Sequence, residues 1–218
     1  MSYLLFIVLT LAIGFGASGF VNHQLSKNSR IRTSTGLTGA QAAQQMLRYY
    51  GIGNVAVKPG GQGQDFFDPK TNSITLSPSS YGVSSITAIA TACHEVGHAC
   101  QYAQDYAPMK LRTAMVPAVN LCSNAWIIIL MVGIFLNLAG LQMIAVILYA
   151  AVVLFALVTL PVELNASKRA IGYMETVGMP AEEVKSSSAV LRACAYTYLA
   201  AALTSLLQLI YLLGVARD

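Results

Sequence analysis

The stretch MVGIFLNLAGLQMIAVILYA, residues 131–150, has only the four residues 137–140 between two long apolar segments. These segments, Met115–Leu136 and Leu141–Leu160, each have the roughly 20 residues that a helix needs to cross a hydrocarbon core. Backbone polar groups must be satisfied inside a bilayer. The sequence therefore predicts two antiparallel transmembrane helices joined by a tight turn.

Two more apolar segments, Tyr3–Val21 and Ala193–Gly214, are equally long, and 56% of the chain is hydrophobic but only 10% charged. An average soluble domain has about 25% charged residues. The first segment lacks the positive leader of a signal peptide, so we interpret it as a retained anchor. We predict a mostly α integral membrane protein with four transmembrane helices.

The distribution of lysine and arginine predicts the orientation, because positively charged loops stay in the cytoplasm. Eight of these residues lie between the first and second spans and four between the third and fourth, but none lies in the hairpin loop. Both polar segments are thus expected to be cytoplasmic and both termini outside, with only Arg217 opposing. This bias explains the net charge of +4, and no basic patch interleaved with aromatic residues indicates nucleic acid.

The polar segment 22–114 has the pattern of a small α+β domain. A helix is predicted over Gly39–Tyr50, after the N-cap Thr38 and before Gly51. The stretches NVAVKP, QDFF and SITLS are predicted to be short strands, the last two joined by the turn DPKTN. An alanine-rich helix then begins at Ser84 or Ser85 and contains TACHEVGHACQ, residues 91–101.

That helix carries a metal-binding pattern. His94 and His98 are four residues apart, so both imidazoles project from one helix face and can bind one zinc ion, while Glu95 lies beside them as a general base toward a water molecule. The alternative is that both histidines are ordinary core residues. The neighbouring small residues Ala92, Gly97 and Ala99 would let another backbone approach closely.

A third ligand is needed, and the candidates on the same side of the membrane are His23, Asp65, Asp68, Asp105, Glu163, Glu175, Glu182 and Glu183. We favour Glu163, because a carboxylate so close to a membrane exit is costly without a cation as partner. Pro161 can bend the helix there, Ala166 permits close packing and Ser167 could hydrogen-bond a ligand. The alternative is an ion pair between Glu163 and Lys168 or Arg169.

These residues resemble a known family. HEVGH, YAPMKLR, the apolar hairpin, LPVELNASKRA, RTSTGLTGAQAAQQML and FFDPKTNSITLS together resemble neutral zinc metallopeptidases of the YugP type over nearly the whole chain. The resemblance implies a bacterial membrane-bound zinc peptidase of the gluzincin kind, with a zincin-like cytoplasmic domain. It also implies that His94, His98 and Glu163 bind the zinc ion and that Glu95 is the catalytic glutamate.

A more distant similarity is to HtpX-like and CAAX-processing membrane proteases. In those proteins an alanine and an aspartate follow the glutamate ligand; Ala166 matches the alanine, but Ser167 replaces the aspartate. Serine is a weaker partner for orienting a ligand histidine. Asn165 points to the opposite helix face and is not expected to be a ligand.

We expect the following organisation: transmembrane helix 1 (1–21), the cytoplasmic zincin-like domain (22–114), the transmembrane hairpin (115–160), a cytoplasmic helical segment with the third ligand (161–192), and transmembrane helix 4 with the C-terminus (193–218). Two ligands come from the domain and one from the end of the third span. One bound zinc is therefore expected to join the domain to the helix bundle.

The predicted function is a multi-pass zinc endopeptidase of the bacterial cytoplasmic membrane that cleaves membrane or membrane-proximal proteins, plausibly in quality control. A substrate peptide could pair with an edge of the QDFF or SITLS strand, and Tyr102, Tyr106, Arg112 and Tyr173 are all candidates for the oxyanion-stabilising group. One alternative is a non-catalytic, zinc-stabilised membrane scaffold that recruits proteins. Another is a zinc hydrolase of lipids or other non-peptide amides.

Overall fold

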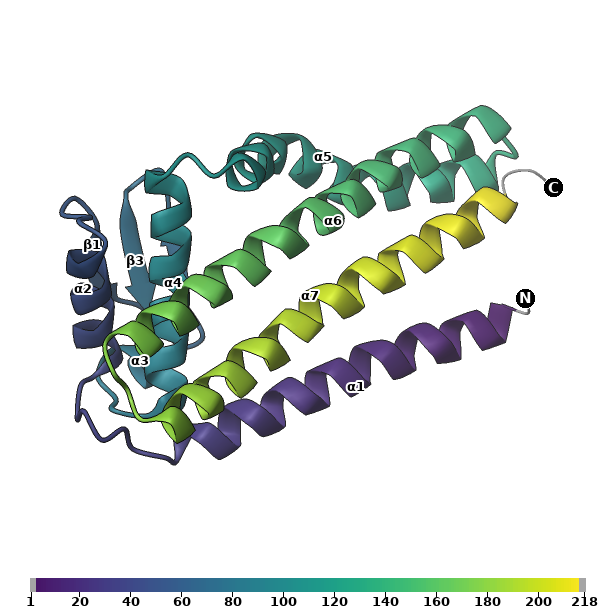
Figure 1. Cartoon of the computed structure of the whole chain (residues 1–218). Helices are drawn as coiled ribbons and strands as arrows, with labels where there is room; N and C mark the ends of the chain where they lie inside the picture. Colours follow the sequence, from purple (N-terminus) through teal and green to yellow (C-terminus); the bar gives the residue numbers. More distant parts are fainter. Residues whose placement is uncertain (1–2, 216–218) are drawn as a thin grey trace. The chain divides into compact units, whose positions relative to one another are not determined.

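The computed structural model describes residues 3–215 and is mostly helical. Four long helices, each long and apolar enough to cross a membrane, confirm the predicted fold class. They are α1 (Tyr3–Ser29), α5 (Ala107–Phe135), α6 (Ala139–Thr176) and α7 (Ala181–Val215) (Figure 1). All four extend beyond the predicted apolar spans, because each continues into a polar segment. Residues 1–2 and 216–218, which include Arg217, lie outside the described residues.

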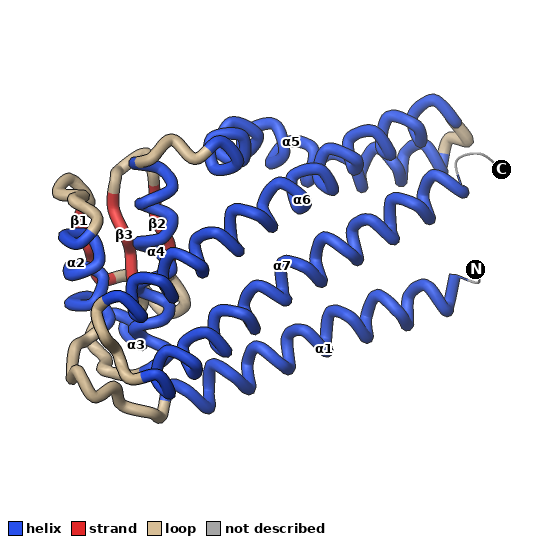
Figure 2. The backbone as a smooth tube through the Cα atoms, viewed as in Figure 1, coloured by secondary structure: helices blue, strands red, loops and turns tan. Residues whose placement is uncertain are grey.

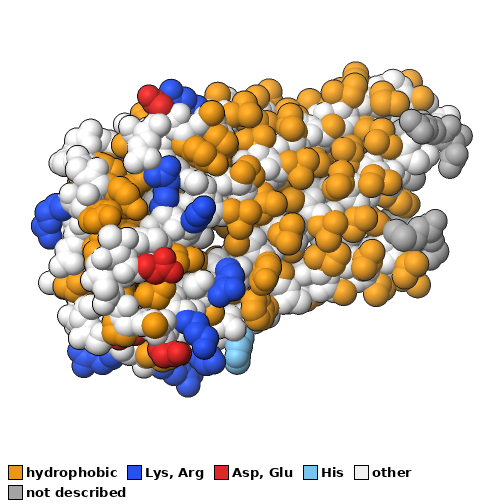
Figure 3. All heavy atoms as spheres, viewed as in Figure 1, with side chains coloured by type: hydrophobic (Ala, Val, Ile, Leu, Met, Phe, Trp, Pro, Cys, Tyr) orange, Lys and Arg blue, Asp and Glu red, His pale blue; other side chains and the backbone are white. Residues whose placement is uncertain are grey.

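The chain divides into two compact units. The first consists of α1 up to Gly16, all of α5, α6 up to Pro161, and α7 from Thr197. In Figure 3 hydrophobic side chains cover the face of these helix segments that is in view. This unit is the apolar part of the structure, as its composition requires.

The predicted hairpin is confirmed inside this unit. Three residues join α5 to α6, and Asn137 has the left-handed φ of 52° that such a tight turn needs. The Gln142 side chain donates a hydrogen bond to the Gly133 carbonyl across the turn (3.2 Å). Pro117 lies inside α5, which changes direction along its length (Figure 1), as a helix does where a proline removes a backbone hydrogen bond.

Aromatic residues connect the helices of this unit. The rings of Trp126 in α5 and Tyr149 in α6 lie 4.6 Å apart between centroids. The Tyr149 hydroxyl donates to Gln208 Oε1 in α7 (3.1 Å), and Phe6 in α1 stacks on Tyr211 in α7. Buried polar groups are thereby hydrogen-bonded within an apolar bundle.

The second unit, residues 17–106 and 162–196, contains the polar domain. Its further elements are α2 (Gly39–Tyr49), β1 (Ala56–Pro59), β2 (Phe66–Asp68), β3 (Ser73–Leu76), α3 (Pro78–Tyr81) and α4 (Ile86–Ala103). The predicted helix starts are confirmed: Thr38 and Gln41 form a capping box on α2, and the Ser85 hydroxyl accepts a hydrogen bond from Ala88 N on α4 (3.2 Å).

The three predicted strands form one sheet in the order β1-β3-β2, beside α2 and α4 (Figure 2). β2 and β3 form the predicted antiparallel pair, and β1 runs parallel to β3. The prediction that the SITLS strand offers an edge to a peptide is wrong, because β3 is the central strand and is paired on both sides. Of the two strands considered, only β2 has an unpaired edge.

Helix α4 is the centre of this unit. It contacts α2, α3 and the sheet on one side, and α6 approaches its other side at Gly97. A Cβ atom at Gly97 would lie 2.5 Å from the carbonyl oxygen and 2.9 Å from the Cα atom of Ala166. Small residues on α4 therefore admit another backbone, as predicted, and that backbone belongs to α6.

Replacing Gly97 with alanine should push α6 away from α4, because backbone atoms leave no room for the added methyl group. We expect a loss of about 1–3 kcal/mol in stability, measured as a lower Tm, together with weaker zinc binding. Gly172→Ala is the matched control, since Gly172 also lies in a helix but has open space around its Cα. Equal Tm values for the two variants would contradict the close approach.

Candidate metal centre

Three predicted ligands from two helices meet inside the second unit. His94 and His98 lie one turn apart on α4, and Glu163 lies on the part of α6 that packs against it. Glu163 Oε2 is 3.1 Å from His94 Nε2 and 3.5 Å from His98 Nε2. Among the residues that the structure describes, these form the only group of three or more histidine, cysteine or acidic side chains that could hold a metal ion.

The spacing of these atoms suits a small tetrahedral cation. Zinc binds imidazole nitrogen and carboxylate oxygen at about 2.0–2.2 Å, so two ligand atoms in a tetrahedral site lie roughly 3.3 Å apart. The two measured separations bracket that value, and all three ligand atoms lie within 4.8 Å of one another. Two histidines and one glutamate are also a donor set of catalytic zinc sites.

A buried amide fixes the orientation of His98. Gln101, which is fully buried, donates through Nε2 to the Val162 carbonyl (2.7 Å) and to Asn165 Oδ1 (3.0 Å). Its Oε1 atom therefore faces His98 Nδ1 at 3.0 Å and must accept the hydrogen bond. His98 thus carries its proton on Nδ1 and presents the lone pair of Nε2 toward Glu163.

This arrangement favours a cation at the centre of the cluster. A nitrogen lone pair that faces a carboxylate oxygen at 3.5 Å is repulsive unless a proton or a metal ion lies between them. Burial lowers the pKa of His98, but the hydrogen bond to Glu163 and the charges of Glu95 and Glu163 outweigh it and raise the pKa. The surroundings therefore stabilise positive charge here, and the residues present fit zinc.

His94 also has a partner that the sequence predicted. Ser167 Oγ lies 3.2 Å from His94 Nδ1, and a hydroxyl can serve as donor or acceptor there. Ser167 lies one turn after Glu163 on α6 and is 8% exposed. The residue that replaces the aspartate of the more distant proteases thus still contacts a ligand histidine.

The other candidates for the third ligand are engaged or placed elsewhere. Asp65 accepts hydrogen bonds from the backbone and hydroxyl of Ser77, and Asp68 accepts from Lys70 N and Thr71 Oγ1 within the β2–β3 turn. Glu183 accepts from Ser34 N. The metal-candidate group also does not include His23, Asp105, Glu175 or Glu182.

The alternative partners proposed for Glu163 do not pair with it. The Arg169 guanidinium donates to Asn165 Oδ1 (2.8 Å) and to Gln104 Oε1 (2.6 Å), and Lys168 is exposed. A series of hydrogen bonds therefore runs from Arg169 through Asn165 and Gln101 to His98. The sequence analysis did not predict these hydrogen bonds. The signal that could have indicated them is Gln101, which lies one turn after His98 on an alanine-rich helix.

Glu95 follows His94 on α4 and lies close enough to His98 for its charge to act on that imidazole. It is 7% exposed, and its charge contributes to the raised pKa of His98. Within the described part of the chain its carboxylate has no hydrogen-bond donor. A buried carboxylate that accepts no hydrogen bond can take up a proton.

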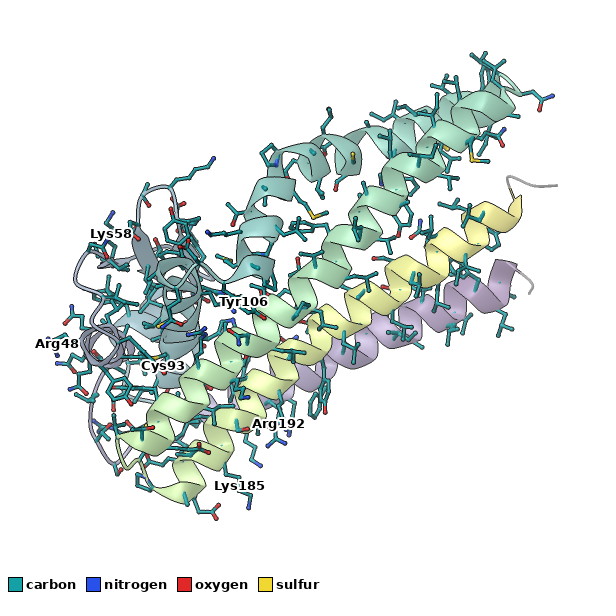
Figure 4. All side chains as sticks on the ribbon, turned by 45° about the horizontal axis from the view of Figure 1, so that its top comes forward. Arg48, Lys58, Cys93, Tyr106, Lys185 and Arg192 are labelled. Atoms are coloured by element: carbon teal, nitrogen blue, oxygen red, sulfur yellow. The ribbon has the colours of Figure 1, made fainter. Side chains whose placement is uncertain are left out.

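The cysteines of α4 do not belong to the cluster. Cys93, on the helix that carries the histidines (Figure 4), is buried, and burial raises the pKa of its thiol to about 12. The Cys100 thiol has a pKa of about 11 for the same reason. Neither thiol belongs to the group of side chains that could hold a metal ion.

Two of the oxyanion candidates have aromatic neighbours. Tyr102 packs on Phe67 of β2, with ring centroids 5.8 Å apart, and the Tyr173 ring lies edge-on to Tyr49 at 5.4 Å. Tyr106 is the last residue of its segment in the second unit, and Arg112 belongs to the first unit. None of these positions identifies the group that would stabilise an oxyanion.

Comparison with known proteins agrees with this site. Residues 3–217 match the sequence model of a family described as "Putative neutral zinc metallopeptidase". The chain belongs to this family. One member, "Putative membrane protease YugP" of Bacillus subtilis (strain 168), is 39% identical over 212 residues, which cover 95% of this chain and 94% of the relative. No solved structure gives a significant match.

Replacing Gln101 with methionine should weaken zinc binding about 10–100-fold, the usual cost of losing a partner that orients a metal ligand. Methionine fills the space but cannot hold the His98 tautomer. Affinity would be measured by competition with a zinc chelator of known affinity.

Gln104→Met is the control for that measurement. Gln104 is the C-cap of the same helix, and its side chain accepts a hydrogen bond from Arg169, at the end of the hydrogen-bond series that is farthest from His98. Equal zinc affinities for the two variants would show that Gln101 does not orient His98.

Proposed function

We propose that this protein is a membrane-embedded zinc endopeptidase that binds one zinc ion through His94, His98 and Glu163. The observation that supports this best is the convergence of the three ligand atoms beside the buried carboxylate of Glu95. Membership of a zinc metallopeptidase family and four helices able to cross a membrane agree with it.

The chemistry assigns a task to each side chain. A zinc ion held by His94, His98 and Glu163 would lower the pKa of a water molecule to about 7 and polarise a peptide carbonyl. Glu95 takes the proton from the attacking water and can return it to the leaving amine. Ser167 and Gln101 keep the two imidazoles in the orientation that binds metal.

Glu95 is the residue that favours an enzyme over a scaffold. A structural zinc site is usually closed by four protein ligands, whereas a catalytic site keeps one position open. Here three ligands converge, and the adjacent carboxylate is not needed to bind metal. The same ligands could serve a hydrolase of other amides or lipids, and membership of the family supports peptide substrates.

We propose that the site faces the cytoplasm, with both termini outside. The two polar segments contain eight and four lysine and arginine residues, whereas the hairpin loop contains none. Positively charged loops stay in the cytoplasm. Substrates would then be membrane proteins, or proteins close to the cytoplasmic membrane surface, of the kind that quality control removes.

Glu95→Gln should leave zinc content unchanged and lower the rate of casein cleavage at least about a hundredfold, since general-base catalysis contributes 10²–10⁴-fold. Wild type and variant would be purified in detergent and compared by elemental analysis and by a cleavage assay. Glu182→Gln, at an exposed position on α7, is the control and should cleave at the wild-type rate. Cleavage by the Glu95 variant at the wild-type rate would contradict its role as base.

Removing the metal should destabilise the second unit, because all three ligands lie within it and join α4 to α6. The expectation that zinc joins the polar domain to the helix bundle stays a prediction. Chelation should lower the Tm of the wild type, and added zinc should restore it. Glu163→Ala should show no such response to zinc, and a response equal to that of the wild type would exclude Glu163 as a ligand.

A further inference from the structure

A groove runs between α6 and α7 on the second unit, outside the ligand cluster. Its first hollow, about 290 Å³, is lined by Leu164, Ser167, Lys168, Ile171, Gly172, Glu175, Leu191, Arg192 and Ala195. A second hollow, about 390 Å³, shares Ile171, Glu175 and Arg192 and continues toward Lys185. The two hollows are neighbours, and we treat them together as one groove, which has apolar side chains such as Leu164 and Ile171 in its lining.

The charged residues of the groove are mainly basic. Lys168, Lys185 and Arg192 line it, against the single carboxylate of Glu175. Lys185 Nζ lies 3.8 Å from Glu182 Oε2 in an exposed ion pair, and such pairs contribute little to the stability of the fold. Within the described residues Lys168 and Arg192 form no ion pair, so the hollow that they share has positive charge available for an anion.

The position of the groove indicates a lipid. Leu164 comes four residues after the end of the third apolar span and Arg192 directly before the start of the fourth, so the groove lies at the polar ends of two helices able to cross a membrane. Figure 4 shows Lys185 and Arg192 projecting outward from α7, and Leu164, which lines the first hollow with Arg192, is 50% exposed. Basic pockets between such helices suit anionic lipid headgroups.

We propose that this groove binds the headgroup of an anionic phospholipid, with Lys168 and Arg192 at the phosphate and the apolar side chains beside the glycerol and upper acyl chains. An acidic peptide offers the same negative charge but has no acyl chains for Leu164 and Ile171. The combination of cations with apolar side chains at the helix ends therefore favours the lipid.

This inference does not rest on the proposed peptidase activity. The groove and the metal centre share only Ser167, whose hydroxyl contacts His94. Lipid binding can be measured without cleavage, so the two proposals can fail separately.

The test titrates delipidated, zinc-loaded full-length protein in detergent with phosphatidylglycerol and counts bound lipid by native mass spectrometry. The double variant Lys168→Gln/Arg192→Gln should bind at least tenfold more weakly than the wild type. Lys58→Gln/Lys70→Gln, with two exposed lysines near the sheet, is the control and should bind like the wild type. Zinc content and Tm equal to the wild type would show that each variant folds, and the single variants should give intermediate affinities.

Two comparisons identify the ligand class. Phosphatidylcholine should bind the wild type at least tenfold more weakly than phosphatidylglycerol, because its headgroup carries no net charge. Equal binding of both lipids, or equal binding by the double variant and the control, would overturn the proposal. A glutamate-rich peptide that displaces phosphatidylglycerol at a lower concentration than the lipid itself would also overturn it and assign the groove to acidic peptides.

Discussion

The close approach of α6 to α4 is the contact on which the site depends. Gly97 lies between His94 and His98 and has no side chain, so the backbone at Ala166 can occupy that space. Glu163 is one turn before Ala166, which places its carboxylate within 3.5 Å of both imidazoles. A glutamate far away in sequence thus reaches the histidines because two small residues meet.

Electrostatics then determine what the site can hold. Glu163 is 2% exposed and Glu95 7%, and two buried carboxylates beside neutral imidazoles are costly without a compensating cation. The hydrogen bond to Gln101 keeps the Nε2 lone pair of His98 directed at Glu163, and Ser167 contacts Nδ1 of His94, so the site suits a metal ion. In the proposed mechanism Glu163 binds the cation, and Glu95 is the base beside it.

Much of this could be predicted from the sequence, because the signals are local. The apolar spans, the capping residues Thr38 and Ser85, the β2–β3 turn and the spacing of His94 and His98 each depend on neighbours within a few residues. The choice of Glu163 depended on the cost of a carboxylate near a membrane exit.

The parts that could not be predicted depend on contacts between distant segments. The order of strands made β3 central rather than an edge. The chain from Arg169 through Asn165 and Gln101 to His98 joins α6 to α4, so its members have no common pattern in the sequence. Asn165, which was not expected to be a ligand, contacts Gln101.

We propose that two imidazoles and one carboxylate hold a zinc ion beside Glu95. X-ray absorption at the zinc edge of the purified protein tests it most directly, since nitrogen and oxygen ligands lie at about 2.0–2.2 Å and sulfur at about 2.3 Å. We expect only nitrogen and oxygen atoms as nearest neighbours of the zinc ion, with the scattering pattern of two imidazoles. A sulfur ligand from Cys93 or Cys100, or a spectrum with no imidazole scattering, would contradict it.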